Sequence, residues 1–582
     1  MSCPAFAKGR DNMIFSERDK RRAFFLGGLM AAVSFLCIFG YRVLIPTYDD
    51  WLLFSRDGVD NMQHYQGWVA YRRTPWQFPI GLIEGILYPD KISVIYTDSV
   101  PLFAVIFKIL SPILPETFQY FGIFGILCAF LLGGYASSFV FHFTGQRVYS
   151  VICSLFFSTA FVFLHRMFYH TALSAQWIVV ASLYLWLAVE YGEEGFGVKR
   201  AVLWGLLSVT ALLTEAYFLP MVWGIMVCDI IGYGLYKRGF WDLILSGLEC
   251  MLPAAAVTMF FGWIFGLFYG EVDSTGLGLG VYTFNLINFI NPFWMSSVIP
   301  WLPSDFFQYE GLAYLGVGMF FLIFVMAVFW LAKSFGTRDS DRYDKRLVHI
   351  GEYSDRQAGG YRLTPLLIFI VGFTVAAVSP TISFGNHRIT VPVPEVMRTL
   401  WSTFRSSGRL IWPVYYLIIL AVCIGLCRAV KNPRGSMAIL CMGLLLQMYD
   451  AHGFIGDLHT KFAPRQTYMS SLSDPGWDRI AQDYEHIMIC PDVHDIYYTY
   501  EGEELEYYAL KNGMTMNIIY TARVVSDRVN ARTERLLDDI RSGRAACDEK
   551  TVYVFLDGKK DAGLNLYYYD LNGFTIGVAQ KL

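Results

Sequence analysis

The sequence has few charged residues and little net charge. Asp, Glu, Lys and Arg make up only 16% of its 582 residues, whereas a soluble domain is nearer a quarter charged. The formal net charge is −3, so no strong field of either sign argues for a nucleic-acid partner. These deficits make a polytopic membrane protein the default class.

Metal- and nucleotide-binding motifs are also missing. The 11 cysteines include no Cys-x-x-Cys pair and no Cys/His metal spacing. Most of them lie in apolar runs, where a thiol acts as a small hydrophobe. The C-terminal region contains neither a Gly-x-Gly-x-x-Gly motif nor a P-loop, so we expect no nucleotide site there.

Apolar and aromatic residues are abundant instead. They make up 55% and 17% of the chain, which excludes disorder. A membrane span needs about 20 mainly apolar residues, and shorter runs can span with their flanking residues. We predict eleven spans, at residues 23–41, 118–146, 148–164, 171–189, 201–214, 216–228, 250–270, 312–332, 363–384, 410–427 and 435–449.

Basic residues predict the orientation. With the N-terminus inside, the segments on that side carry roughly twice as many Lys and Arg as those on the other side. We therefore expect a multi-pass plasma-membrane protein with a cytoplasmic N-terminus and an external C-terminus. The first span is too long for a cleavable signal peptide, and no small-residue cleavage site follows it.

The chain divides into three regions. Residues 1–22 are a basic cytoplasmic N-terminus, residues 23–449 are the transmembrane domain, and residues 450–582 are an extracytoplasmic domain. Strand signals at 485–490, 514–521 and 551–556, a helix at 526–542 and a hairpin at 567–578 predict a small α/β fold. Cys490 and Cys547 lie in this domain, and both a disulfide and two thiols are compatible with the sequence.

The first external loop, at about 46–117, is long and rich in acidic and aromatic residues. Asp60, His64 and Trp68 follow one another at intervals of four and share a helix face. We predict an amphipathic helix over 60–71 that lies at the membrane interface. A carboxylate beside an imidazole suits proton abstraction from an alcohol or amine, although a solvated helix without chemistry has the same pattern. Asp98 could cap the helix at 100–110 or supply a second carboxylate to the same site.

Polar residues also gather at other outer ends of the spans. Arg405 and Arg409, four apart, could clamp a phosphate from one helix face or simply snorkel to the interface. His165, Arg166 and His170 form a cluster that suits ligands or an ordinary boundary. Glu215 is expected at the external end of a hairpin, facing the same cavity or marking the turn. Two further loops, at about 271–311 and 380–409, carry polar residues of the kind that line cavities.

Several longer stretches resemble integral membrane glycosyltransferases of the GT-C superfamily, in particular a bacterial family of multi-spanning proteins. The similarity to protein O-mannosyltransferases and aminoarabinose transferases is more distant and rests on topology. The resemblance covers most of the membrane region and, more weakly, the external domain. Its stretches are Asp60-x-x-Gln63-His64-x-x-Gly67-Trp68 followed by Arg72, then 75–79, 96–102, 118–122, 172–177 and 404–409.

The resemblance implies glycosyl transfer at the outer membrane face. The donor is a polyprenyl-phosphate sugar, the acceptor is a glycan, lipid or protein of the cell envelope, and the anomeric carbon is inverted. A first-loop carboxylate acts as general base, which the motif places at Asp60 with Asp98 as second candidate. Further residues would bind the substrates: His64, Arg72, His170 and Glu215 in the pocket, and Arg405 and Arg409 at the phosphate.

Because of one departure from the family pattern, other carboxylates are also candidates for the general base. The family has a Gly-Asp pair where this chain has Val59 before Asp60, so Asp49, Asp50 and Asp57 remain alternatives. Metal dependence differs within the superfamily. Because the loop has no Asp-x-Asp pair, we favour a site without a metal cofactor and keep a divalent metal as the alternative.

Other functions also fit a protein of this kind. A flippase or transporter of lipid-linked glycans would need charged residues within several spans, whereas here they gather at the outer ends. A polymerase of envelope polysaccharide would use similar chemistry. A non-catalytic scaffold would tolerate the loss of Asp60.

Overall fold

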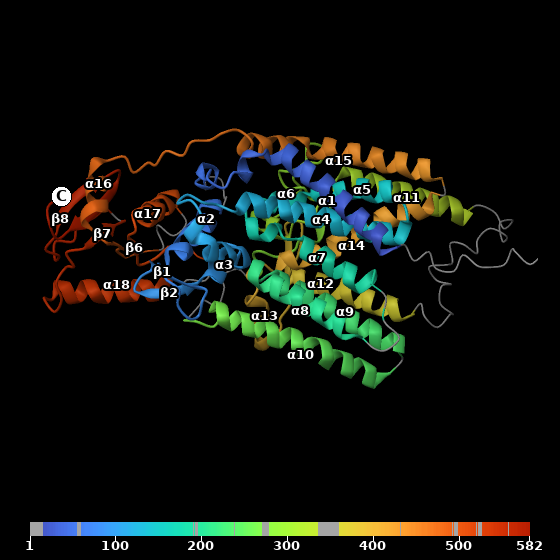
Figure 1. The fold of residues 1–582 in the computed structure, drawn as a ribbon, viewed down its shortest axis with the longest axis horizontal. Coiled ribbons are helices and arrows are strands. Elements are labelled where there is room, and N and C mark those ends of the chain that lie inside the picture. The colour runs from blue at the N-terminus through green and yellow to red at the C-terminus, as the bar shows by residue number, and fades with distance from the viewer. Residues whose placement is uncertain are drawn as a thin grey trace, which may run out of the picture.

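The protein consists of a helical body with a smaller α/β domain at one end (Figure 1). A computed structural model describes residues 16–54, 60–189, 191, 196–237, 239–270, 279–335, 360–430, 432–491, 493, 499–519, 521, 526–556 and 558–582. Several features named above fall wholly or partly outside these residues: the first part of the basic N-terminus, Asp57 and Val59, and much of the loops around 271–278 and 336–359.

Helices occupy all the predicted apolar runs. They are α1 (Glu17–Phe39), α4 (Phe121–Thr144), α5 (Arg147–Ser158), α6 (Phe161–Arg166), α7 (Trp177–Leu187), α8 (Val198–Thr214), α9 (Phe218–Lys237), α10 (Phe240–Phe265), α11 (Val317–Phe335), α12 (Gly360–Val378), α14 (Trp412–Ala429) and α15 (Pro433–Phe462).

Six of the described helical segments are long and apolar enough to cross a membrane: α1, α4, α9, α10, α15 and the segment Ser407–Ala429, which includes α14. The remaining predicted spans correspond to shorter helices. The run at 148–164, for example, is divided between α5 and α6. The chain is thus a multi-pass membrane protein with six candidate spans, and the count of eleven stays a prediction. Helix α15 also continues past residue 450 to Phe462, beyond the start expected for the external domain.

The first loop folds into a compact layer between the body and the α/β domain (Figure 1). It contains α2 (Asn61–Arg73), α3 (Pro101–Leu110) and the antiparallel hairpin β1 (Leu82–Leu87) and β2 (Asp90–Ser93). The helix predicted at 60–71 is confirmed, but its place at a membrane interface is wrong. Trp68 and Tyr71 are 0% exposed, and Trp68 Nε1 donates to the Phe118 carbonyl at 2.8 Å. Other parts of the chain cover this helix where headgroups were expected.

Asp98 does not cap the helix that follows it. Helix α3 begins at Pro101, and its N-cap residue is Val100, which makes no side-chain capping bond. A proline at the first helical position has no N–H to satisfy. Asp98 instead ends a short 3₁₀ helix (Val94–Thr97) in the left-handed conformation.

The described parts of the two later loops are joined by polar contacts, and their role in lining a cavity stays a prediction. They carry β3 (Thr381–Phe384), β4 (His387–Thr390), α13 (Glu395–Ser402) and 3₁₀ helices η6 (Leu286–Phe289), η7 (Phe306–Gly311) and η11 (Ser407–Ile411). Asn285 is fully buried, and its Nδ2 donates to Gln308 Oε1 and to the Gly385 carbonyl, both at 2.8 Å. Asn285 therefore fastens the two loops together.

The C-terminal domain is the predicted α/β fold. Its five-stranded mixed sheet has the order β6-β5-β7-β9-β8, with the hairpin of β8 and β9 turning at Asn572 and Gly573. Cys490 and Cys547 are not joined by a disulfide. The strands are β5 (His486–Ile489), β6 (Thr515–Met516), β7 (Thr551–Phe555), β8 (Tyr567–Leu571) and β9 (Phe574–Val578), and the helices are α16 (Pro475–Asp483), α17 (Tyr500–Lys511) and α18 (Ser526–Arg541).

The domain is docked directly onto the first loop. Gln66 Nε2 in α2 donates to the Glu503 carbonyl in α17 at 2.7 Å. The Tyr88 N–H donates to the Met516 carbonyl at 2.7 Å, and Arg532 Nη1 in α18 pairs with Asp90 Oδ2 at 2.7 Å. Helix α17 thus contacts α2, whereas β6 and α18 contact the β1–β2 hairpin.

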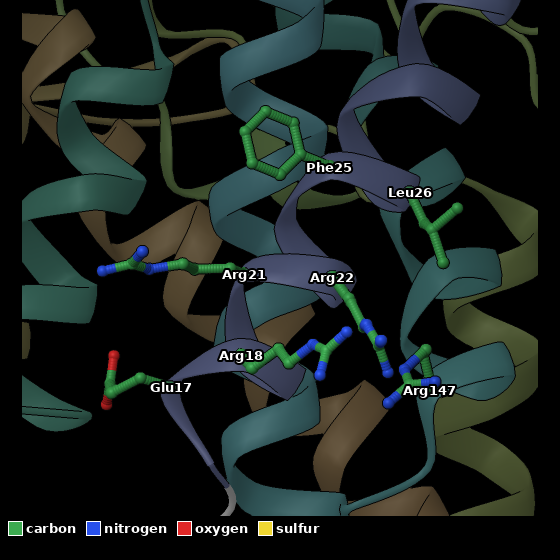
Figure 2. Close-up of a pocket in the computed structure, with 7 residues that line it drawn as sticks. All are labelled: Glu17, Arg18, Arg21, Arg22, Phe25, Leu26 and Arg147. Carbon is green, nitrogen blue, oxygen red and sulfur yellow. The ribbon is translucent and has the colours of Figure 1, made fainter.

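Positive charge gathers around the start of α1, at the end of the body far from the C-terminal domain (Figure 1). A pocket of about 720 Å³ lies there. In Figure 2, Arg22 points toward Arg147 of α5 with Arg18 beside them, whereas Arg21 points to the other side of α1. Arg147 Nη2 also pairs with Asp19 Oδ1 at 2.5 Å. This basic end is the one expected on the cytoplasmic side.

Candidate functional site

Asp60 and His64 enter the site from the first turn of α2. Asp60 is the N-cap residue, but its carboxylate makes no capping hydrogen bond. Its N–H donates to the Tyr169 carbonyl at 3.0 Å, which holds the start of α2 beside His170. One helical turn later, His64 lies on the same face and is fully buried.

Asp98 reaches the site through a strained turn. Asp98 and Val100 both have positive φ, at 54° and 51°, a conformation that is unusual for a β-branched residue such as Val100. Ser99 Oγ, between them, donates to the His64 carbonyl at 2.7 Å. Gly67 allows this close approach, because a Cβ there would lie 2.4 Å from Ser99 Oγ. The turn and α2 are therefore locked together.

His170 and Glu215 complete the cluster from two further connections. His170 lies between α6 and the 3₁₀ helix η5 (Thr171–Ser174), and Glu215 ends α8. His170 Nε2 is 3.6 Å from Asp98 Oδ2, and the His64 and His170 rings are 4.8 Å apart between centroids. The Glu215 side chain is hydrogen-bonded to that of Asp98. Five of the predicted site residues thus meet in one place.

These five residues form two overlapping sets of potential metal ligands. One set is Asp60, His64 and His170, and the other is Asp98, His170 and Glu215. Within each set, one oxygen or nitrogen atom per residue lies within 4.8 Å of the others. We name these five residues the acid–histidine cluster.

Burial and like charges shift the protonation of the cluster. Burial, and then the neighbouring Asp98 carboxylate, raise the pKa of Asp60 to about 7. The same two causes raise the pKa of Glu215 to about 8. Burial lowers the pKa of His64 to about 3, and burial and His64 lower the pKa of His170 well below its usual value. The imidazoles are therefore neutral at physiological pH.

A buried group of three charges lies beside the cluster. Arg166 Nη2 and Arg409 Nε each lie 2.7 Å from Glu310 Oε2. Burial alone would raise the pKa of Glu310, but the two guanidiniums hold it below its usual value. Arg166 and Glu310 also act on the charge of Asp60. Because two cations share one anion, this arginine–glutamate triad retains one positive charge.

The terminal amines of Arg409 remain available for a ligand. Only its Nε bonds to Glu310, and its Nη atoms have no hydrogen-bond partner among the residues that the structure describes. The guanidinium is stacked at 4.4 Å from the centroid of Tyr217. Gly408 permits the approach of this segment to Glu310, because a Cβ there would lie 2.8 Å from Gly311 Cα.

Arg405 and Arg409 do not share a helix face as predicted. Arg405 lies in the turn before η11 and Arg409 lies inside that short 3₁₀ helix. The Arg405 guanidinium lies 5.3 Å from the Tyr282 centroid, whereas that of Arg409 lies over Tyr217. A spacing of four residues places two side chains on one face only in an α-helix, and this segment is not α-helical.

Other predicted residues have structural contacts. Arg72 Nη1 donates to the Glu116 carbonyl at 2.8 Å and thereby fastens the first loop. Asp49 Oδ2 accepts the Tyr65 hydroxyl at 2.7 Å, and Asp50 Oδ1 accepts the Tyr468 N–H at 2.9 Å. The structure thus groups Asp60 and Asp98, rather than Asp49 and Asp50, with the histidines.

Two members of the site were not chosen from the sequence. The sequence marks Arg166 only as part of the polar cluster with His165 and His170, and it gives Glu310 no motif. The one signal for Glu310 is its position, a single acid directly before the apolar run at 312–332. Its pairing with arginines 144 and 99 positions away depends on the tertiary fold.

The fold and the site define a class: a multi-pass membrane protein with a buried acid–histidine cluster near its docked α/β domain. The chain belongs to a family described as a domain of unknown function, DUF6311, whose model matches residues 28–452. The C-terminal domain of the same family matches residues 476–579. A comparison with curated proteins finds no match.

Proposed function

We propose that the protein is a membrane glycosyltransferase of the GT-C type. It transfers a sugar from a polyprenyl-phosphate donor to a glycan, lipid or protein acceptor of the cell envelope. The observation that carries this proposal is the meeting of Asp60 and Asp98 with the arginine–glutamate triad. A base and an excess positive charge then lie side by side, as transfer from a phosphate leaving group requires.

The chemistry needs one base and one site for an anion. A carboxylate, Asp60 or Asp98, accepts the proton of an acceptor hydroxyl. The hydroxyl oxygen bonds to the anomeric carbon while the bond from that carbon to the phosphate oxygen breaks. The electron pair leaves with the phosphate, and the configuration of the anomeric carbon is inverted. A phosphate leaving group needs charge stabilisation more than it needs a proton.

Arg409 is suited to hold the phosphate. Its Nη atoms are not engaged by the described protein, and the triad has one positive charge to spare. A guanidinium can bind two phosphate oxygens at once. Arg166 also pairs with Glu310, so the single negative charge of Glu310 neutralises only one of the two positive charges. This role falls to Arg409 more directly than to Arg405.

The position of the site agrees with a lipid-borne donor at the outer face. The cluster belongs to the connections between body helices and to the first loop, near the C-terminal domain. The basic end of α1 lies at the opposite end of the body (Figures 1 and 2). With that end in the cytoplasm, the cluster faces outward, where polyprenyl-phosphate sugars serve as donors.

A transporter of lipid-linked glycans has one observation in its favour, a buried ion pair within the helices. Arg200 Nε lies 2.7 Å from Asp229 Oδ2. However, the same arginine donates to the Leu185 and Val189 carbonyls at 2.7 and 3.1 Å. It thereby satisfies the end of α7. We therefore assign the pair a structural role.

The test is transfer by the purified full-length protein in nanodiscs. Radiolabelled polyprenyl-phosphate sugars are offered together with extracted envelope lipids and glycans. We expect wild-type protein to move label to an acceptor, Asp60→Asn to be inactive, and the matched first-loop variant Asp50→Asn to be active. Equal transfer by wild type and Asp60→Asn would remove Asp60 from the mechanism. Absence of transfer with every donor would contradict the proposed function.

A further inference from the structure

His64 and His170 carry buried ring nitrogens without partners. Among the residues that the structure describes, neither ring nitrogen of His64 has a hydrogen-bond partner, and the same holds for Nδ1 of His170. His64 is 0% exposed, so water outside the protein cannot satisfy it. Buried polar atoms are nearly always paired in native proteins. Three orphaned nitrogens next to a carboxylate therefore point to a missing ligand.

The missing ligand has to satisfy nitrogen lone pairs and an acid together. Asp60 contributes a carboxylate oxygen within 4.8 Å of a nitrogen of each histidine. Asp60 makes no capping bond with that carboxylate, so the side chain is free to turn toward the rings. Two imidazoles and one carboxylate are a common ligand set for first-row divalent metals.

We propose that Asp60, His64 and His170 bind one divalent transition-metal ion, such as Zn²⁺ or Mn²⁺. Ligand atoms about 2.0–2.2 Å from a tetrahedral ion lie roughly 3.3–3.6 Å apart. The ligand atoms now lie within 4.8 Å of one another. The three side chains therefore have to rotate when the ion binds, so that these distances shorten. Three protein ligands leave the fourth position open for a substrate oxygen.

The first ligand set fits better than the second. Glu215 and Asp98 already bond to each other, and Glu215 Oε1 also accepts the Tyr217 N–H. The nitrogens of His64 have no such partner within the described part of the chain. The ion is therefore placed between Asp60 and the two histidines, with Asp98 and Glu215 beside it. An Asp-x-Asp pair is not needed for such a site, because its ligands would come from two separate segments.

A metal ion at this place would also have a part in the proposed glycosyl transfer. That part rests on the proposed function, whereas the metal site itself does not. With Asp60 holding the ion, Asp98 is the carboxylate left to accept the acceptor proton. The ion would bind a phosphate oxygen of the donor at its open position, next to Arg409. Metal binding itself is measured without any sugar donor.

The experiment measures metal in the purified full-length protein. The protein in nanodiscs is stripped with a chelator and reloaded with Zn²⁺ or with Mn²⁺. Bound metal is then counted by mass spectrometry, and affinity is measured by competition with a chromogenic chelator. We expect one ion per chain, with Mg²⁺ a poor competitor because it prefers all-oxygen sites. His64→Gln and His170→Gln should each lose at least about 100-fold in affinity.

Controls keep the result interpretable. His452→Gln changes an exposed histidine of α15 whose ring contacts the Tyr449 carbonyl, and it should bind metal as wild type does. If His64→Gln fails to fold, Asp60→Asn serves instead, because Asp60 is only partly buried. Zn²⁺ should also raise the thermal midpoint of wild type and leave that of the ligand variants unchanged.

Two results would overturn the proposal. One is wild-type protein that retains no more metal than His64→Gln, and the other is equal affinity in wild type and both histidine variants. Failure of the metal site and failure of the proposed function are distinguishable. Sugar transfer that persists in chelator leaves the function without the metal, whereas bound metal without transfer leaves the metal without the function.

Discussion

Asp60 occupies an N-cap position without acting as a cap. Asp at an N-cap usually accepts a backbone N–H and thereby stabilises the helix, but here the carboxylate has no such bond. Replacing it should therefore have little effect on folding. We predict that Asp60→Asn lowers sugar transfer at least about 100-fold and shifts the thermal midpoint by less than about 2 °C. Transfer kinetics and thermal unfolding of the same preparation check this, and a large loss of stability would show that the residue is structural.

Glu310 is predicted to be essential for stability as well as for the site. Glu310→Gln would leave two buried guanidiniums without their carboxylate, and breaking such a pair costs about 3–5 kcal/mol. The exposed Glu395, whose oxygen is 4.0 Å from Arg398, is the matched control, because a surface pair contributes less than about 1 kcal/mol. Thermal unfolding of both variants measures the difference. Equal midpoints would show that the triad is not a buried network.

At the scale of elements, the approach of α2 to the turn at 97–99 sets the geometry of the site. We predict that Gly67→Ala lowers transfer, because the new Cβ would lie 2.4 Å from Ser99 Oγ and push the turn that carries Asp98 away from α2. Alanine in a helix is otherwise favoured over glycine by about 1 kcal/mol. Gly456→Ala in α15 is the control, because nothing lies within 4 Å of its Cβ. Full activity of Gly67→Ala would show that this contact is not needed.

The elements that could be predicted from the sequence are those with a strong local signal. Long apolar runs located every body helix, and alternating apolar residues with an Asn-Gly turn located the last hairpin. The helix at 60–71 was found, but its surroundings were not. The amphipathic pattern suggested a membrane surface, whereas α17, from more than 400 residues later, packs against this helix.

Part of the candidate site was predictable, because some of its residues also have a local sequence signal. Asp60 and His64 are linked by helical spacing, and His170 and Glu215 stood out as polar residues at the ends of spans. Asp98 stood out as an acid of the first loop, just before the predicted helix at 100–110. Nothing local could show that His170 approaches Asp98 or that Glu310 pairs with Arg409. The predicted arginine pair at 405 and 409 failed because it assumed an α-helix where the chain forms a turn and a 3₁₀ helix.

At the scale of the whole molecule, the account requires the C-terminal domain outside and the start of α1 inside. A C-terminal fusion to alkaline phosphatase, which is active only outside the cytoplasm, should therefore be active. A fusion of green fluorescent protein at the same place should stay dark when exported through the Sec route. The opposite pattern would place the acid–histidine cluster at the cytoplasmic face and remove polyprenyl-phosphate sugars as donors.

Release of polyprenyl phosphate is the most direct measure of the central claim, that the acid–histidine cluster transfers a sugar rather than moving an intact lipid. Proteoliposomes containing a polyprenyl-phosphate sugar and acceptor extract allow release and transbilayer movement to be followed together. The account predicts release of polyprenyl phosphate by wild type and by Asp50→Asn, and none by Asp60→Asn. Movement of the intact donor without release, unaffected by Asp60→Asn, would contradict it.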